Sequence, residues 1–222
     1  MRGCSSATEC VILVHGLART CRSMASMETH LIEAGYQTLT VDYPSRKKRL
    51  EVLVSENFNP VLKFCGQQGF GKIHCVTHSL GGIIVRLALA VHKPHNLGRV
   101  VMLSPPNQGS LVAEKLKKWW LFKLVNGPAG QQLATFPDCL PGRSGPVDYE
   151  VGVITGNRHV FFDSWFASFF SGDNDGKVAV EEARLEGMKD FLIVPETHPF
   201  IMNSYRVREQ ALFFLQQGFF HP

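Results

Sequence analysis

Hydrophobic residues in the first half of the chain occur in short runs separated by longer amphipathic stretches. Four runs are rich in β-branched residues and end beside glycine, proline or serine, which is typical of buried strands: residues 10–15, 36–44, 72–78 and 98–104. Helices are expected between them at residues 22–34, 50–65 and 80–92, with Pro60 interrupting the second. This alternation predicts a parallel sheet with helices on both faces.

The second half of the chain is less regular. Strands are expected at residues 149–155 and 190–195, and a last helix at residues 203–217. Residues 105–148 combine a basic helix with loops rich in proline and glycine. We therefore predict one domain over residues 1–222. Its fold is α/β and doubly wound, with a mostly parallel sheet of about six strands and a helical and loop insertion at about 105–148.

Composition narrows the class of protein. Hydrophobic residues make up 45% and charged residues 19% of the 222 positions, which favours a core-forming globular protein. The net charge of +4 is too small to favour nucleic acid as a partner. The six cysteines form no C-x-x-C motif, so neither a metal nor a redox cofactor is expected. The first ten residues lack the apolar core of a secretory signal, and a cytoplasmic location is the resulting expectation.

The stretch CVTHSLGG, residues 75–82, carries the first candidate for chemistry. Ligands of open parallel sheets bind at the carboxyl ends of the strands, and Ser79 follows the third predicted strand. The stretch approaches the G-x-S-x-G pattern of a nucleophilic serine, with Gly81 and Gly82 after the serine. Thr77 replaces the first glycine, and its branched side chain takes space that glycine would leave free. The alternative role for Ser79 is a helix cap.

A serine nucleophile needs a base, because its hydroxyl is a weak nucleophile at neutral pH. His78 is adjacent in sequence, but successive side chains diverge from the backbone and it is not expected to reach Ser79. Five histidines follow Ser79: His92, His95, His159, His198 and His221. His198 lies just beyond the last predicted strand, at the same edge of the sheet as Ser79, and is therefore the candidate base.

The acid that orients this base is expected between the serine and the histidine in the chain. Asp175 is the first candidate, because it begins a turn into an apolar segment, followed by Asp173 and then Asp163. Its function would be to hold the imidazole tautomer and to stabilise the imidazolium.

A calcium loop is a rival interpretation of the same segment. Residues 171–182 place Asp173, Asp175, Gly176 and Glu182 at positions typical of calcium ligands. Ser171 would be a weak first ligand, and a lysine and an alanine stand where carbonyl or water ligands are usual. We therefore predict no metal.

Two backbone N–H groups are needed to hold the oxyanion of an acyl-transfer reaction. Leu80 directly follows the serine and supplies one candidate. Leu17, in the sequence VHGLART after the first strand, supplies the other.

The sequences VHGL, HSLGG, PPNQGS, NDGKVAVEEARLEG and ETHPFIM occur in an order that resembles the α/β-hydrolases, most closely the small bacterial lipases and esterases. The resemblance implies Ser79, Asp175 and His198 as a catalytic triad, with Leu17 and Leu80 as oxyanion donors and no cofactor. It also implies that the N-terminal strand pair of larger members is missing. Thr77 and the long gap between Gly156 and Asp175 depart from the family pattern.

These features predict a serine hydrolase of carboxylic esters whose partner is a small acyl ester. The alternatives are an acyltransferase or thioesterase with the same triad, and a catalytically silent binding protein. Residues 114–125, around Trp119 and Trp120, are either a lid that meets a lipid interface or a helix that covers the sheet. The aromatic residues 160–170 either line an acyl pocket or pack in the core. The oligomeric state stays open.

Overall fold

Six parallel strands form the centre of the molecule. The computed structural model describes residues 8–116, 118–133, 145–159, 170 and 172–222. Within these residues the strands are β1 (Cys10–Val14), β2 (Gln37–Val41), β3 (Ile73–His78), β4 (Leu97–Leu103), β5 (Val151–Arg158) and β6 (Asp190–Thr197). Their order in the sheet is β2-β1-β3-β4-β5-β6, and every neighbouring pair is parallel. The predicted doubly wound α/β fold is therefore confirmed.

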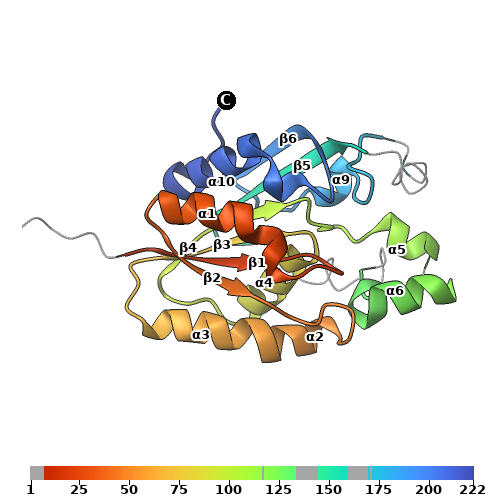
Figure 1. The fold of residues 1–222 in the computed structure, drawn as a ribbon, viewed down its shortest axis with the longest axis horizontal. Coiled ribbons are helices and arrows are strands. Elements are labelled where there is room, and N and C mark those ends of the chain that lie inside the picture. The colour runs from red at the N-terminus through yellow and green to blue at the C-terminus, as the bar shows by residue number, and fades with distance from the viewer. Residues whose placement is uncertain (1–7, 117, 134–144, 160–169, 171) are drawn as a thin grey trace, which may run out of the picture.

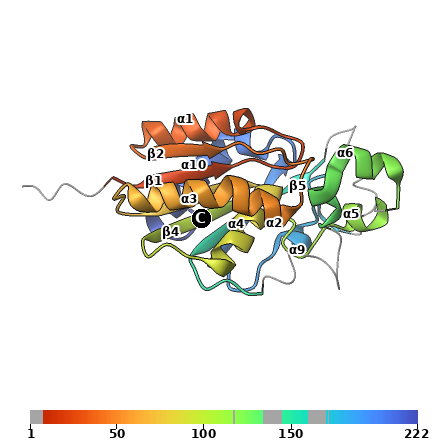
Figure 2. The same cartoon turned by 90° about the horizontal axis from the view of Figure 1, so that it is seen from below.

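Helices cover both faces of this sheet (Figures 1 and 2). One face carries α1 (Ala25–Glu33), which follows a short 3-10 turn (Cys21–Met24), and α10 (Tyr205–Gln217), which follows another (Ile201–Asn203). The other face carries α2 (Leu50–Leu53), α3 (Asn59–Gln67) and α4 (Leu80–Val91). Each face has its own hydrophobic core, with alternate residues of β1 contributing to one core or the other. This explains why all five residues of β1 are buried.

The helix predicted at residues 50–65 forms, but its winding changes along its length. Residues Val54–Phe58 adopt a π-helical turn between α2 and α3. Pro60 lies in the first turn of α3, where its missing N–H group matters least. The interruption expected from Pro60 thus takes the form of a wider turn just before it, and not of a break.

The segment between β4 and β5 lies beyond the carboxyl ends of the strands (Figure 1). It contains α5 (Leu111–Leu116) and α6 (Trp120–Gln131). The prediction of a single basic helix around residues 114–125 is therefore wrong. The N–H of Trp119 donates to the carbonyl of Leu116 in a turn, and a new helix begins at Trp120. Helix α6 itself kinks at Gly127, whose φ of 62° favours glycine. A side chain there would also meet the carbonyl of Arg46.

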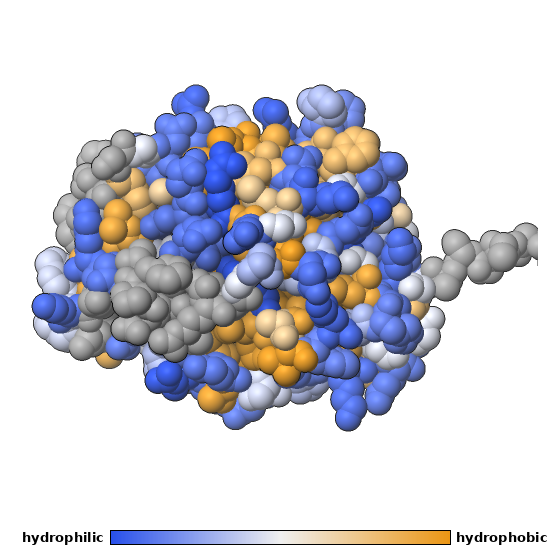
Figure 3. Space-filling model, turned by 180° about the vertical axis from the view of Figure 1, so that it is seen from behind, coloured by the Kyte–Doolittle hydropathy of each residue, from blue (hydrophilic) through white to orange (hydrophobic). Residues whose placement is uncertain are grey.

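The side of the molecule opposite to that seen in Figure 1 mixes hydrophobic and hydrophilic side chains at its surface (Figure 3). Strand β6 forms one edge of the sheet and contains Pro195, a residue that edge strands tolerate because the outward N–H position needs no partner. Among the helices that the structure describes, none has the length and apolar character needed to cross a membrane.

Candidate active site

Ser79 occupies a strained turn between β3 and α4. Its φ of 51° and ψ of −118° lie in a region that residues other than glycine seldom adopt. The N–H of Ser79 donates to the carbonyl of Leu103 at 2.8 Å, and the N–H of Gly82 donates to the carbonyl of Ser79 at 3.0 Å. These bonds hold the turn so that the hydroxyl faces the cavity beyond the sheet, which is the geometry of a nucleophile elbow.

The two glycines after Ser79 allow this turn to form. A Cβ on Gly81 would lie 2.5 Å from the carbonyl oxygen of Val14, so α4 begins directly against the end of β1. A Cβ on Gly82 would lie 3.3 Å from Oγ1 of Thr77. The extra volume of the fully buried Thr77 is thus accommodated by the missing side chain of Gly82. The threonine that departs from the family pattern does not prevent the elbow.

Replacing Gly81 by alanine should destabilise the protein by about 2–4 kcal/mol, because a rigid backbone carbonyl occupies the space of the new methyl group. Chemical denaturation measures this change. Gly66→Ala is the matched control on α3, where a Cβ meets nothing within 4 Å, and it should be neutral or slightly stabilising. Equal effects of the two substitutions would contradict the close approach of α4 to β1.

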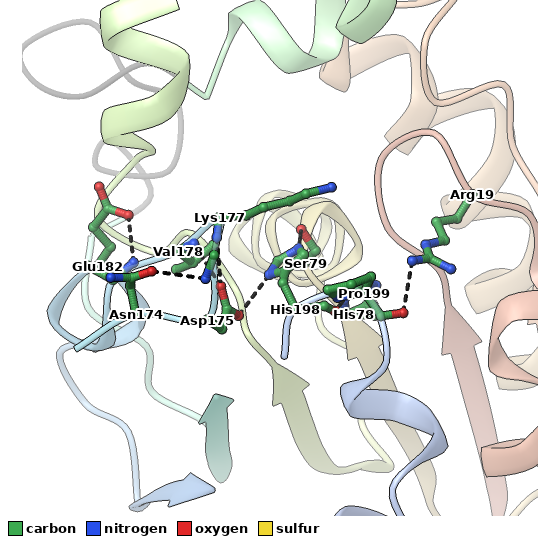
Figure 4. Close-up of polar contacts among 12 residues, drawn as sticks. Arg19, His78, Ser79, Asn174, Asp175, Lys177, Val178, Glu182, His198 and Pro199 are labelled. Carbon is green, nitrogen blue, oxygen red and sulfur yellow. Dashed lines mark hydrogen bonds and ion pairs between the residues drawn. The ribbon is translucent and has the colours of Figure 1, made fainter. Parts of the chain in front are cut away.

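Ser79, His198 and Asp175 form one hydrogen-bonded chain (Figure 4). The distance from Ser79 Oγ to His198 Nε2 is 3.1 Å, and that from His198 Nδ1 to Asp175 Oδ2 is 2.8 Å. The three residues are 8%, 5% and 0% exposed, so the contacts are shielded from water. Ser79 directly follows β3, Asp175 lies in the loop before α9 (Val180–Ala183), and His198 directly follows β6. The structure therefore brings together the three residues that the sequence singled out.

Asp175 is fixed by bonds to both of its oxygens. Its Oδ1 accepts the N–H groups of Lys177 at 3.0 Å and Val178 at 2.9 Å, which leaves Oδ2 for His198. The N–H of His198 also donates to the backbone carbonyl of Asp175 at 3.0 Å. The alternative acid Asp173 is exposed, and its backbone carbonyl accepts the N–H of Val180.

The structure does not describe some of the residues proposed as an alternative acid, as a calcium ligand or as an acyl pocket. Asp163 and the first calcium ligand, Ser171, lie outside the described residues, as does most of the aromatic segment 160–170. The carboxylates of Asp175 and Glu182 accept N–H groups of the protein, and the residues that the structure describes contain no group of three or more His, Cys, Asp or Glu side chains that could hold a metal ion.

His78 contacts His198 in a way that sequence reasoning did not foresee. Its Nε2 donates to the backbone carbonyl of His198 at 3.0 Å, and the two rings lie 4.9 Å apart. Burial, together with the neighbouring His198, Arg19 and Lys177, holds the pKa of His78 well below its usual value. His78 is thus a neutral donor that ties the end of β3 to the loop carrying His198. The other histidines after Ser79 are exposed and do not line the cavity: His92, His95, His159 and His221.

The loop after β1 is braced by an aromatic residue at the end of β2. The ring of Tyr43 stacks on that of His15 at 4.0 Å, and its hydroxyl donates to the carbonyl of His15. The next residue, Gly16, passes so close to the elbow that a Cβ would lie 3.2 Å from that of Ser79. Leu17 then reaches the cavity wall. Leu80, the other expected oxyanion donor, begins α4, where first-turn amides have no carbonyl partner within the helix.

A cavity of about 320 Å³ opens above Ser79. Its walls are mostly apolar and come from the loop after β1, from α5 and α6, and from the loop carrying Asp175. Leu17, Val112, Ala113, Leu133 and Val178 supply much of the apolar surface. Such a cavity suits a small molecule that presents an apolar group to the walls and a polar centre to the serine.

Glu182 joins the insertion to the loop that carries Asp175. Its carboxylate accepts the N–H of Leu111 at 2.7 Å, at the start of α5, and that of Ala179 at 3.0 Å. Burial raises the pKa of Glu182 to about 7, and the nearby charge of Asp175 adds to the effect.

The contribution of Glu182 to the stability of the protein should therefore fall as pH rises from about 5 to about 8, opposite in sign to that of His78, whose lowered pKa favours the folded state as pH rises. In this window the folded chain binds the proton of Glu182 while the unfolded chain, with its ordinary pKa of 4.5, has lost it, so rising pH favours unfolding. Glu182→Gln should remove up to about 2 kcal/mol of this pH dependence, measured by denaturation at each pH. Glu181→Gln, at an exposed neighbouring carboxylate, should retain the wild-type slope. A slope unchanged in Glu182→Gln would contradict this assignment.

A family model described as "alpha/beta hydrolase fold" matches residues 9–138. The chain belongs to this family, and it resembles small bacterial lipases and esterases within it. No curated protein sequence matches the chain.

Solved structures share the fold at low sequence identity. The mature lipase BlEst2 of Bacillus licheniformis is 21% identical with a TM-score of 0.69, covering 96% of this chain and 93% of its own. The metagenomic carboxyl esterase MGS0156 is 18% identical with a TM-score of 0.70, covering 89% and 66%. The phospholipase PlaB of Legionella pneumophila is 21% identical with a TM-score of 0.64, covering 80% of this chain but only 46% of its own.

Proposed function

We propose that the protein is a serine hydrolase that cleaves carboxylic esters through an acyl-enzyme. The observation that carries this proposal is the chain of contacts from Ser79 Oγ to His198 Nε2 at 3.1 Å and from His198 Nδ1 to Asp175 at 2.8 Å, beneath a mostly apolar cavity. Similar folds described as a lipase, a carboxyl esterase and a phospholipase support it. A binding protein without activity would not need His198 within reach of Ser79.

In the first half-reaction, Ser79 Oγ attacks the carbonyl carbon of the ester while His198 Nε2 takes its proton. Asp175 stabilises the imidazolium that forms. The N–H groups of Leu17 and Leu80 hold the oxyanion of the tetrahedral intermediate. His198 then returns the proton to the departing alcohol, the carbon–oxygen bond to the alcohol breaks, and the acyl group stays on Ser79.

Water completes the cycle in the second half-reaction. His198 takes a proton from the water as its oxygen attacks the acyl carbon. The second tetrahedral intermediate collapses when His198 donates that proton to Ser79 Oγ, which releases the carboxylic acid. Every group required belongs to this chain, so the mechanism calls for neither metal nor cofactor.

The insertion at residues 105–148 is proposed to act as a lid-like part of the same domain. Helix α6 lines the cavity with Asn126 and Gly130, while Trp119, Trp120 and Leu124 are more than half exposed on the same segment. Exposed aromatic residues on a segment that also lines the cavity suit contact with a lipid interface. The substrate is accordingly a small acyl ester, either free or presented at such an interface.

Hydrolysis of 4-nitrophenyl esters of increasing acyl length tests the proposal. We expect turnover, with an initial burst as the acyl-enzyme accumulates. A serine-directed fluorophosphonate should modify the protein once, and mass spectrometry should map the adduct to Ser79. An added alcohol that diverts the acyl group from water would reveal a transferase. No turnover and no adduct at Ser79 would overturn the proposal.

A further inference from the structure

Two positively charged side chains line the cavity that contains Ser79. Arg19 comes from the loop after β1, and Lys177 from the loop that carries Asp175. The lining that the structure describes includes no Asp or Glu side chain. The carboxylate of Asp175 lies behind His198 and is fully buried. The cavity is therefore apolar over much of its wall but positively charged close to the serine.

The position of Lys177 is tied to the proposed catalytic acid. Its N–H donates to Asp175 Oδ1 at 3.0 Å, so the carboxylate that orients His198 also fixes the backbone of this lysine. Its exposed side chain extends past Ser79 toward the side on which Arg19 lies (Figure 4). Lys177 and Ser79 line the same cavity, so a ligand bound there lies beside the side chain of this lysine.

Arg19 is tied to the other side of the site. Its Nη2 donates to the carbonyl of Pro199 at 2.8 Å, directly after His198. Its own N–H closes a turn onto the carbonyl of Gly16 at 3.3 Å, next to the proposed oxyanion loop. The guanidinium keeps further N–H groups that can bind an anion in the fork geometry typical of arginine.

Neither cation forms an ion pair with a carboxylate of the residues in the described ranges, although many cations elsewhere do. Lys48, Lys93, Arg99 and Arg184 each pair with an acidic side chain. The positive charges of Arg19 and Lys177 face one cavity and repel each other. They also contribute to the lowered pKa of His78. An anionic ligand in the cavity would relieve this repulsion.

We propose that the cavity selects acyl esters that carry an anionic group, a carboxylate or a phosphate, close to the ester bond. Arg19 and Lys177 bind the anion, while the apolar remainder of the substrate packs against Val112, Ala113 and Leu133. This inference rests on the proposed ester hydrolysis and names its substrate class. It differs from a general stabilisation of the oxyanion, which would accelerate charged and neutral esters equally.

Matched pairs of esters, in which the second member has its anion masked by methylation, separate these effects. The first pair is mono-4-nitrophenyl adipate and its methyl ester, with the charge on the acyl side. The second is the butanoyl ester of 3-hydroxybenzoate and that of its methyl ester, with the charge on the alcohol side. The third is the butanoyl ester of 3-hydroxyphenyl phosphate and that of its dimethyl triester. The measured quantity is the ratio of kcat/KM within each pair.

We expect the wild type to prefer the charged member of at least one pair by about tenfold or more. Lys177→Met and Arg19→Met should each reduce that ratio by about three- to tenfold, and the double variant should bring it close to one. Lys177→Arg should retain most of it. Lys63→Met, at an exposed lysine of α3 away from the cavity, is the matched control and should leave the ratio unchanged.

A ratio that is equal in the wild type and the double variant overturns the inference, and so does an equal fall in kcat/KM for both members. If the wild type still hydrolyses neutral esters when the charge preference fails in this way, the result contradicts anion selection but not ester hydrolysis. No turnover of any ester overturns the proposed function itself. If the double variant does not fold, the salt dependence of the wild type provides the test. The preference of the wild type for the charged ester should shrink several-fold between about 0.05 and 0.5 M NaCl. A preference that does not change with salt overturns the inference.

Discussion

Replacing Ser79 by alanine is expected to lower kcat/KM for ester hydrolysis by about 10⁵- to 10⁶-fold. Alanine removes the only atom that forms the covalent bond to the acyl group, while His198 and Asp175 keep their mutual contact at 2.8 Å. The fold should remain, because Ser79 contributes to the turn through its backbone N–H and carbonyl, which alanine retains. Residual activity would reflect binding and the oxyanion donors alone.

Ser110 provides the matched control, because it lines the same cavity and carries the same nucleophilic group. Its Oγ accepts the N–H of Ala113 at 3.3 Å, a contact at the start of α5. Ser110→Ala should cost about 1 kcal/mol of stability and less than tenfold in kcat/KM. Circular dichroism and the thermal midpoint verify that each variant is folded. Hydrolysis by Ser79→Ala within tenfold of the wild type, or its loss in Ser110→Ala instead, would move the nucleophile elsewhere.

The strands and the neighbourhood of Ser79 and His198 could be predicted because local pattern determines them. Runs of β-branched residues bounded by glycine and proline define β1 to β4, and parallel strands bring their carboxyl ends to one edge. Any polar residue that directly follows such a strand therefore lies near the others. The close approach of α4 to β1 depends on Gly81, one of the two glycines that the sequence places directly after Ser79 and Leu80.

The contacts that fix the site could not be predicted, because each joins residues far apart in the chain. His78 donates to the carbonyl of His198, 120 positions away, and Glu182 accepts the N–H of Leu111, 71 positions away. Whether such atoms meet depends on the paths of loops that obey no period. Thr77 is similar: its tolerance depends on Gly82, whose missing side chain faces it only once the helix has packed on the strand.

The choice between Asp173 and Asp175 shows most clearly which part of the site the sequence alone cannot predict. The two aspartates lie two positions apart in one loop, and only their place relative to the following apolar segment distinguishes them in the sequence. The decision is made by the turn itself, in which the N–H groups of Lys177 and Val178 bind Asp175 Oδ1 and aim Oδ2 at His198. Asp173 remains exposed, with its backbone carbonyl bonded to Val180. Sequence could rank the two acids but not orient them.

Replacing Asp175 by asparagine should accordingly lower kcat/KM by about 10³- to 10⁴-fold with little change in fold. The amide oxygen can keep the two N–H groups of Lys177 and Val178, which places the amide NH₂ opposite His198 Nδ1. That NH₂ group donates, so it favours the imidazole tautomer with its proton on Nε2. His198 then cannot accept the proton of Ser79, and the first step of the reaction slows.

Asp173→Asn tests the same change two positions away and should alter kcat/KM by less than threefold, because the side chain is exposed and outside the cavity lining. The comparison also tests the calcium interpretation. A calcium loop would need both carboxylates, so each variant and a chelator would then lower the thermal midpoint of the protein. We expect neither Asp173→Asn nor a chelator to do so. A larger loss of activity in Asp173→Asn than in Asp175→Asn would assign the acid to the other residue.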